Sequence, residues 1–129
     1  MKLSQNFKLN EFLHQGIECI PTEVMDNLDE LADSLQVLRN EINAPININS
    51  GYRTHDHNKK VGGSPTSQHL LGKAADMWVS GWEPERLHGV IERLIRIGKM
   101  KQGGLGLYDT FVHYDIRGYR ARWDFRTKG

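Results

Sequence analysis

The sequence is poor in cysteine and has no long apolar run, and each absence excludes a class of protein. Cys19 is the only cysteine in 129 residues, so neither an intramolecular disulfide nor a zinc cluster of several thiolates can form. No apolar segment approaches the ~20 residues that a transmembrane helix needs. We therefore expect no membrane insertion, and we expect any metal to be bound by histidines and carboxylates.

The first twenty residues also lack the features of a secretory signal. They contain no continuous apolar stretch and no small-residue cleavage site, so we expect the chain to be cytoplasmic as synthesised. The apolar share of 38% and the charged share of 26% are those of an ordinary globular protein. We therefore expect one folded domain over residues 1–129, with a monomer as the default state.

Charge gives little reason to expect nucleic acid as a partner, because the formal net charge is only +1. The carboxyl-terminal residues are more basic. They include five basic residues and a single acidic one, Asp124. The basic residues are Arg117, Arg120, Arg122, Arg126 and Lys128. A solvated terminal segment explains this excess. Attraction to an anionic polymer is the alternative, and cell-wall glycans with anionic stem peptides would qualify as well as DNA.

Two segments have the periodicity of amphipathic helices. Residues 21–40 place apolar side chains at spacings of three and four on one face, and residues 84–98 repeat this pattern after Pro84. A short polar helix is expected over residues 54–60, with Thr54 as its cap.

Short apolar segments predict the strands, over residues 46–49, 75–79, 105–108 and 111–116, with an edge strand over 120–125. Asp109 and Thr110 form a tight turn between the third and fourth of these segments. Because helices and antiparallel-looking strands occupy separate blocks, we predict an α+β fold. In it, a small antiparallel sheet packs against helices.

The segment from Ser67 to Asp76 contains residues that bind metals. Small residues let the chain turn back closely at Gly72, so His69 and Asp76 can converge although they stand seven positions apart. Histidine nitrogen and carboxylate oxygen are both good zinc ligands. Each residue has an ordinary alternative, since a lone histidine is often a helix cap and an aspartate at a strand start often belongs to a turn.

His113 is the best candidate for a third ligand. Side chains alternate along the strand 111–116, so Phe111, His113 and Asp115 share one face and the apolar residues between them fit a core. Two histidines and one aspartate with an open fourth position are typical of a catalytic zinc site. A polar pair between His113 and Asp115 is the alternative.

Three blocks in this order resemble the M15 zinc peptidases. They are Ser50-Gly51-Tyr52-Arg53, then Ser67-x-His69-x-x-Gly72-x-Ala74-x-Asp76, then Gly104-Leu-Gly-Leu-Tyr108 followed by Phe111-Val-His113-x-Asp115-x-Arg117-Gly118. The opening residues 3–12 are similar to short phage and prophage members. This family includes D-alanyl-D-alanine carboxypeptidases and dipeptidases, L-alanyl-D-glutamate endopeptidases and phage endolysins, and the resemblance covers nearly the whole chain.

The resemblance implies a fold like that of hedgehog and D-Ala-D-Ala peptidases, with the zinc site on the sheet. The positions that match the three zinc ligands of the family are His69, Asp76 and His113. Arg53 matches an arginine that contacts substrate and stabilises developing negative charge. Ser67 and Tyr108 are expected to contact substrate as well.

The catalytic base is where this sequence departs from some members. Several subfamilies have an acidic residue three positions before the last zinc-binding histidine, where this chain has Thr110, which cannot act as a carboxylate base. Asp115 is the favoured base because it shares the strand face of His113, about 7 Å along the strand. Its alternative role is to orient a zinc-bound histidine. Asp109, in the turn, is the second candidate.

The resemblance implies a zinc peptidase that cuts stem peptides of bacterial peptidoglycan, as a carboxypeptidase or an endopeptidase. Thr110 leaves a second hypothesis open, a catalytically silent zinc domain that only binds the cell wall. A nucleic-acid-binding module is the third, and no recognition motif supports it. The lack of a signal peptide fits release by a phage-type membrane lesion, carriage on a virion or an intracellular dipeptidase, and the sequence does not separate these. The bond that is cut stays open as well.

Overall fold

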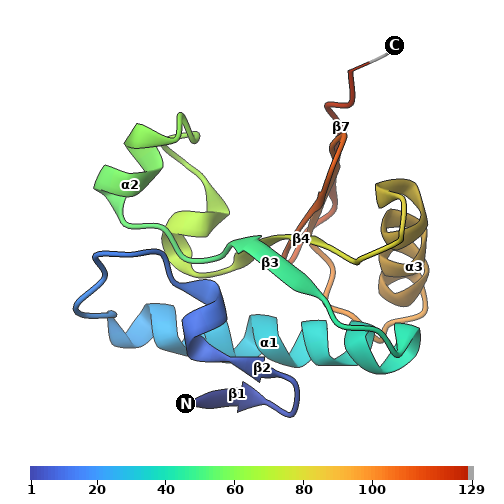
Figure 1. Ribbon diagram of the computed structural model, residues 1–129, viewed down its shortest axis with the longest axis horizontal. Helices are drawn as coiled ribbons and strands as arrows, with labels where there is room; N and C mark the ends of the chain where they lie inside the picture. The colour runs from blue at the N-terminus through green and yellow to red at the C-terminus, as the bar shows by residue number, and fades with distance from the viewer. Residues whose placement is uncertain (128–129) are drawn as a thin grey trace.

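The computed structural model describes residues 1–127 and is built around a five-stranded sheet (Figure 1). In spatial order its strands are β3 (Asn47–Ser50), β4 (Ala74–Trp78), β6 (Val112–Asp115), β5 (Gly104–Leu107) and β7 (Ala121–Asp124). The helices are α1 (Thr22–Ile42), α2 (His55–Lys60) and α3 (Pro84–Arg96), with 3₁₀ helices η1 (Leu9–Phe12) and η2 (Gln68–Leu71). A separate hairpin pairs β1 (Lys2–Ser4) with β2 (Phe7–Lys8).

The three predicted helices are present. The apolar stripe of α1, which includes Leu28, Leu31 and Leu35, is fully buried, and α1 packs against α3. Pro84 begins α3, as its preset backbone angle favours. Thr54 caps α2, because its side chain accepts a hydrogen bond from the backbone N–H of His57. No helix in residues 1–127 combines the length and the apolar character that crossing a membrane requires.

The prediction of an α+β fold is confirmed, but the sheet is mixed rather than antiparallel. β3, β4, β6 and β5 pair antiparallel in turn, whereas β7 pairs parallel with β5. Both edges of β6 are already occupied, by β4 and β5. The chain that returns after β6 pairs instead with the outer edge of β5, where it runs in the same direction as β5.

The two faces of the sheet differ in character. On the face that joins the core of α1 and α3, the fully buried side chains are Ala75, Met77, Leu105, Val112 and Tyr114. On the opposite face, the strand register aligns one residue from each strand in a row, in the order Ser50, Asp76, His113, Gly106 and Trp123. Two predicted metal ligands are thus direct cross-strand neighbours, which is what brings them together.

Gly106 is the gap in this row through which Trp123 reaches across β5. A Cβ on Gly106 would lie 2.1 Å from Nε1 of Trp123, so no other residue leaves room for the indole. The ring centroids of Trp123 and His113 are consequently only 5.0 Å apart. Trp123 also donates its Nε1–H to the hydroxyl oxygen of Tyr108 at 2.9 Å.

We expect Gly106→Ala to destabilise the protein and Gly89→Ala to stabilise it. The methyl group at position 106 must displace Trp123, and such overpacking costs about 1–3 kcal/mol. Gly89 is exposed within α3, and a Cβ there meets nothing within 4 Å. Alanine should therefore recover the roughly 0.5–1 kcal/mol that glycine costs inside a helix. Chemical denaturation gives the change in the free energy of unfolding for each variant. Equal changes at the two positions would contradict the packing described for Trp123.

Candidate active site

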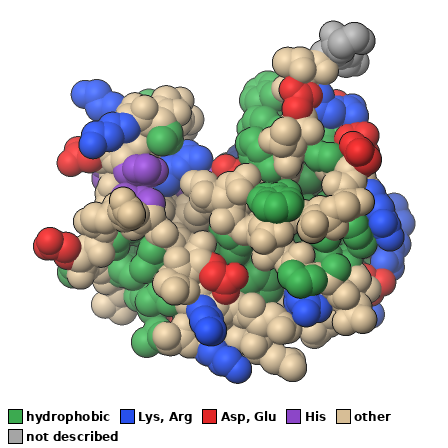
Figure 2. Space-filling model, in the orientation of Figure 1, with side chains coloured by type: hydrophobic (Ala, Val, Ile, Leu, Met, Phe, Trp, Pro, Cys, Tyr) green, Lys and Arg blue, Asp and Glu red, His purple; other side chains and the backbone are tan. Residues whose placement is uncertain are grey.

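A cleft of about 470 Å³ opens over the polar face of the sheet, in the hollow between the α2 lobe and β7 (Figure 2). Its lining includes every predicted metal ligand and every predicted substrate contact, namely Arg53, Ser67, His69, Asp76, Tyr108 and His113. These residues come from three separate parts of the chain, and the fold brings them to one site. The two predicted base candidates, Asp115 and Asp109, do not line this cleft.

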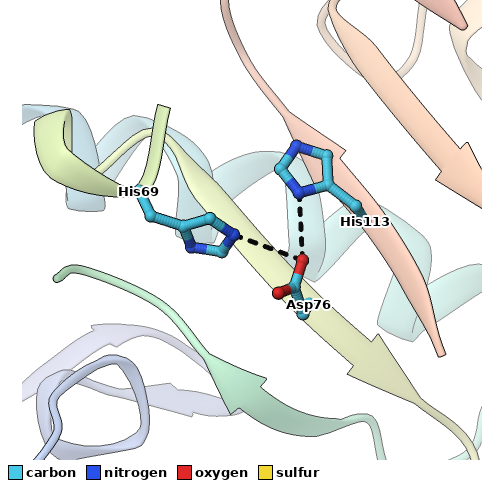
Figure 3. Close-up of side chains that lie close together, drawn as sticks. All are labelled: His69, Asp76 and His113. Carbon is cyan, nitrogen blue, oxygen red and sulfur yellow. Dashed lines mark hydrogen bonds and ion pairs between the residues drawn. The ribbon is translucent and has the colours of Figure 1, made fainter. Parts of the chain in front are cut away.

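The side chains of His69, Asp76 and His113 converge on one point (Figure 3). Nε2 of His69 lies 3.2 Å and Nδ1 of His113 lies 2.9 Å from the same oxygen, Oδ1 of Asp76. Gly72, with a φ of 73°, turns the chain from η2 into β4, and β4 places Asp76 opposite His113 on β6. The three potential ligand atoms all lie within 4.8 Å of one another.

The outer nitrogen of each imidazole faces a fixed acceptor. Nδ1 of His69 lies 2.7 Å from the carbonyl oxygen of Gly51, and Nε2 of His113 lies 2.7 Å from Oδ2 of Asp115. Because these acceptors need a proton on the outer nitrogens, the inner nitrogens of neutral imidazoles present lone pairs. Two lone pairs then face one carboxylate oxygen, which is repulsive unless a cation or a proton lies between them. The donor set therefore fits a metal ion, and its composition suits zinc.

Asp76 is held in its anionic form. Burial raises the pKa of the Asp76 carboxyl. When protons rather than a metal ion occupy the inner nitrogens of His113 and His69, their hydrogen bonds to Asp76 outweigh burial and keep this pKa well below its ordinary value. Nη2 of Arg53 lies 3.4 Å from Oδ2, the oxygen that does not face the histidines. At neutral pH, Asp76 thus offers a charged oxygen ligand at the floor of the cleft.

Arg53 is an oriented cation beside this carboxylate. Its Nε donates to Oγ of Ser50 at 3.0 Å and its Nη1 donates to Oδ1 of Asn58 at 3.2 Å. Its backbone N–H donates to the carbonyl oxygen of His69 at 3.0 Å, which ties the two segments together. The side chain is only 14% exposed. The guanidinium is therefore held in one place, facing the cleft.

Asp115 lies beneath His113, with no exposed surface on its side chain. Oδ1 accepts from the backbone N–H of Gly104 at 2.8 Å and from Nε of Arg117 at 2.9 Å. Oδ2 faces Nε2 of His113 and accepts from Nη2 of Arg117 at 2.7 Å. Burial raises the pKa of Asp115, but hydrogen bonds with Arg117 and His113 keep it well below its ordinary value. The carboxylate is thus placed to orient His113, the alternative that the sequence left open.

Asp109 and Thr110 are exposed in the turn between β5 and β6. Asp109 accepts hydrogen bonds from the backbone N–H of Thr127 at 3.0 Å and from its hydroxyl at 2.7 Å. Neither Asp109 nor Thr110 lines the cleft. Within residues 1–127, Asp76 is the only carboxylate in the cleft lining.

Among the cleft-lining residues that were not predicted, Arg117 and Trp123 lie next to Asp115 and His113. Arg117 holds Asp115 from one side, and Trp123 packs against the ring of His113. A signal for both exists in the sequence. For Arg117, the signal is its place two positions after Asp115. For Trp123, it is the pair of glycines, Gly104 and Gly106, that alternates with leucines in β5, because glycine within a strand marks a place where another group approaches closely.

The basic residues near the carboxyl terminus take part in ion pairs. Arg120 and Arg122 both face Glu92 of α3, and Arg126 pairs with Asp124. Lys128 lies outside the described residues. These pairs neutralise much of the excess positive charge, which favours a structural explanation of it over an anionic polymer.

A family model described as Peptidase M15 matches residues 5–115. Among solved structures, the chain is similar to the L-Ala D-Glu endopeptidase ChiX of Serratia marcescens, with 19% identity and a TM-score of 0.47 over 79% of this chain and 93% of that chain. No match was found among curated proteins. Because the family model spans most of the chain, including η2, β4 and β6, this protein belongs to the M15 peptidase family.

Proposed function

We propose that this protein is a zinc-dependent peptidase that hydrolyses stem-peptide bonds of bacterial peptidoglycan. The observation that supports it most directly is the convergence of two imidazole nitrogens on Oδ1 of Asp76, at the floor of an open cleft. Membership of a peptidase family supports a peptide substrate. The resemblance of the three sequence blocks to M15 enzymes that act on stem peptides supports peptidoglycan.

His69 would hold the zinc through Nε2, His113 through Nδ1, and Asp76 through its carboxylate. When bound, zinc supplies a Lewis acid that makes water nucleophilic near neutral pH and polarises the substrate carbonyl. Arg53 presents its fixed guanidinium beside Asp76. We assign it two tasks, contacting the substrate and stabilising the negative charge that develops on the carbonyl oxygen.

Ser67 and Tyr108 are proposed as hydrogen-bond donors to the substrate. Oγ of Ser67 accepts from the backbone N–H of His69 at 3.1 Å, so its own proton is free for another partner. The hydroxyl of Tyr108 accepts from Trp123 and likewise keeps its proton for a group in the cleft. Both residues line the cleft.

Asp115 is proposed to orient His113 rather than to receive the proton of the attacking water. Its oxygens are occupied by His113, Arg117 and the N–H of Gly104, and its side chain has no exposed surface. By keeping a proton on Nε2 of His113, it leaves the lone pair of Nδ1 directed at the metal position.

The test combines metal analysis of the purified protein with mass spectrometry of purified peptidoglycan incubated with it. We expect about one zinc per chain and a discrete new peptide product that is lost on chelation and returns with added zinc. The mass of the product identifies the bond. Full activity in the chelated protein would exclude the proposed metal chemistry.

A second candidate function is a zinc domain that binds the cell wall without cleaving it. It is favoured by one observation, that no carboxylate other than Asp76 lines the cleft within residues 1–127. Stoichiometric zinc and sedimentation with peptidoglycan, with no product from any stem peptide, would support this candidate over the peptidase.

A further inference from the structure

One side of the cleft is aromatic. Phe125, Tyr108 and Trp123 line it, and Phe111 stacks on Tyr108 with ring centroids 4.4 Å apart. Phe125 meets Tyr108 edge to face at 5.7 Å, and the hydrogen bond from Trp123 fixes the outer end of Tyr108. We refer to these four residues as the aromatic wall. Stacking and hydrogen bonding hold its rings in place before any ligand arrives.

The outermost ring of the aromatic wall is left in water. Phe125 is 67% exposed, directly after β7, and it is continuous with the half-buried rings of Tyr108 and Trp123. An exposed aromatic ring that extends an apolar surface into a cleft marks a place where a ligand binds. The aromatic wall therefore offers a binding surface next to the metal ligands.

The opposite side of the cleft is polar. It is formed by residues 62–68, where Ser64 and Thr66 bring their hydroxyls within 3.1 Å of each other. A π face carries partial negative charge and attracts the positively polarised C–H groups of a ring laid against it. Hydroxyls across the cleft can exchange hydrogen bonds with a polar edge. A ligand that fits both sides has one flat C–H face and a rim of hydroxyl or amide groups.

We propose that the aromatic wall is a saccharide subsite that binds a pyranose ring of the glycan to which the stem peptide is attached. This inference rests on the proposed function, because it names a further part of the same substrate. Stem-peptide side chains are methyl groups, carboxylates and amines, which give a phenyl ring little to cover. The C–H faces of the pyranose rings are the extended apolar surfaces of peptidoglycan.

The position of the aromatic wall also determines how short a peptide can connect a bound sugar to the metal ligands. Trp123 lies 5.0 Å from the ring of His113, and Phe125 is one ring beyond Tyr108. An extended peptide covers at most ~3.6 Å per residue. Because these ring-to-ring distances are short, a few extended residues are enough to join a sugar stacked on Phe125 to a peptide bond at the metal ligands, so the proposed subsite allows a cut in the sugar-proximal part of the stem.

The test compares one stem peptide in two forms, free and linked to its N-acetylmuramyl saccharide, as substrates of the zinc-loaded protein. We expect the wild-type kcat/KM to be about 2–10-fold higher for the linked form, the range that one aromatic contact contributes. Phe125→Ala should lower the ratio of linked to free cleavage to about one. Phe125→Tyr, which keeps the ring, should retain the preference. Because Phe125 is exposed, these variants should fold normally.

Tyr119→Ala is the matched control, since Tyr119 is 62% exposed and does not line the cleft. Its ratio of linked to free cleavage should equal that of the wild type. Equal cleavage of the two forms by the wild type, or an equal loss on both forms in Phe125→Ala, would overturn the saccharide subsite while leaving the peptidase intact.

Calorimetric binding of the two peptides separates this inference from the proposed function. If neither peptide is cleaved, the proposed peptidase activity fails. Tighter binding of the linked peptide, lost in Phe125→Ala and kept in Tyr119→Ala, would still support the saccharide subsite. Equal binding of the two forms would overturn it.

Discussion

His69→Ala should abolish both zinc binding and peptide hydrolysis. His69 supplies one of three ligand atoms, and its imidazole is fixed by the carbonyl of Gly51 so that Nε2 faces Asp76. Losing a ligand outright should weaken zinc binding by more than the roughly 10–100-fold that loss of an outer hydrogen-bond partner costs. Metal analysis gives the zinc content, and mass spectrometry of digested peptidoglycan gives the activity.

The matched control is His55→Ala. His55 is exposed on α2 and outside the cleft lining, so its loss should change neither zinc content nor product. Thermal unfolding provides a second readout. Zinc at 100 times its Kd should stabilise the wild type and His55→Ala by roughly 2.7 kcal/mol, and His69→Ala hardly at all. Stoichiometric zinc in His69→Ala would refute the proposed ligand set.

Asp115→Asn should weaken zinc binding by about 10–100-fold and leave turnover at saturating zinc largely intact. The amide keeps the shape of the side chain but accepts at only one atom, whereas Asp115 faces donors from His113, Arg117 and Gly104. The tautomer of His113 is then no longer enforced. Loss of hydrogen bonds to the charged Arg117 should also cost roughly 1.5–3 kcal/mol of stability.

The same variant distinguishes the two roles considered for Asp115. If Asp115 takes a proton from water, Asp115→Asn should bind zinc normally and lose on the order of 10²–10⁴ in kcat. Zinc titration followed by kinetics at saturating zinc separates these outcomes. Asp109→Asn serves as the control, because Asp109 is exposed, bonds to Thr127 and does not line the cleft. A drop in kcat in that variant would instead support Asp109 as the catalytic base.

Local patterns in the sequence predict most of the regular structure. These patterns involve residues close together in the sequence. They include the apolar stripe of α1, Pro84 at the start of α3 and Thr54 as the cap of α2. The convergence of His69 and Asp76 is local as well, because one turn at Gly72 separates η2 from β4. The amino-terminal hairpin has strands of only three and two residues, too short to show any period.

The sequence by itself determined the types of ligand, their order and, through its resemblance, the family. Only the tertiary structure decided the parallel placement of β7, because that depends on which strand edge is still free when the chain returns. It also decided where Asp115 points. Alternation along β6 puts Asp115 on the face of His113, but hydrogen bonds from Gly104 and Arg117 hold it beneath the ring and out of the cleft. Strand register and burial arise between segments distant in sequence, so no local pattern contains them.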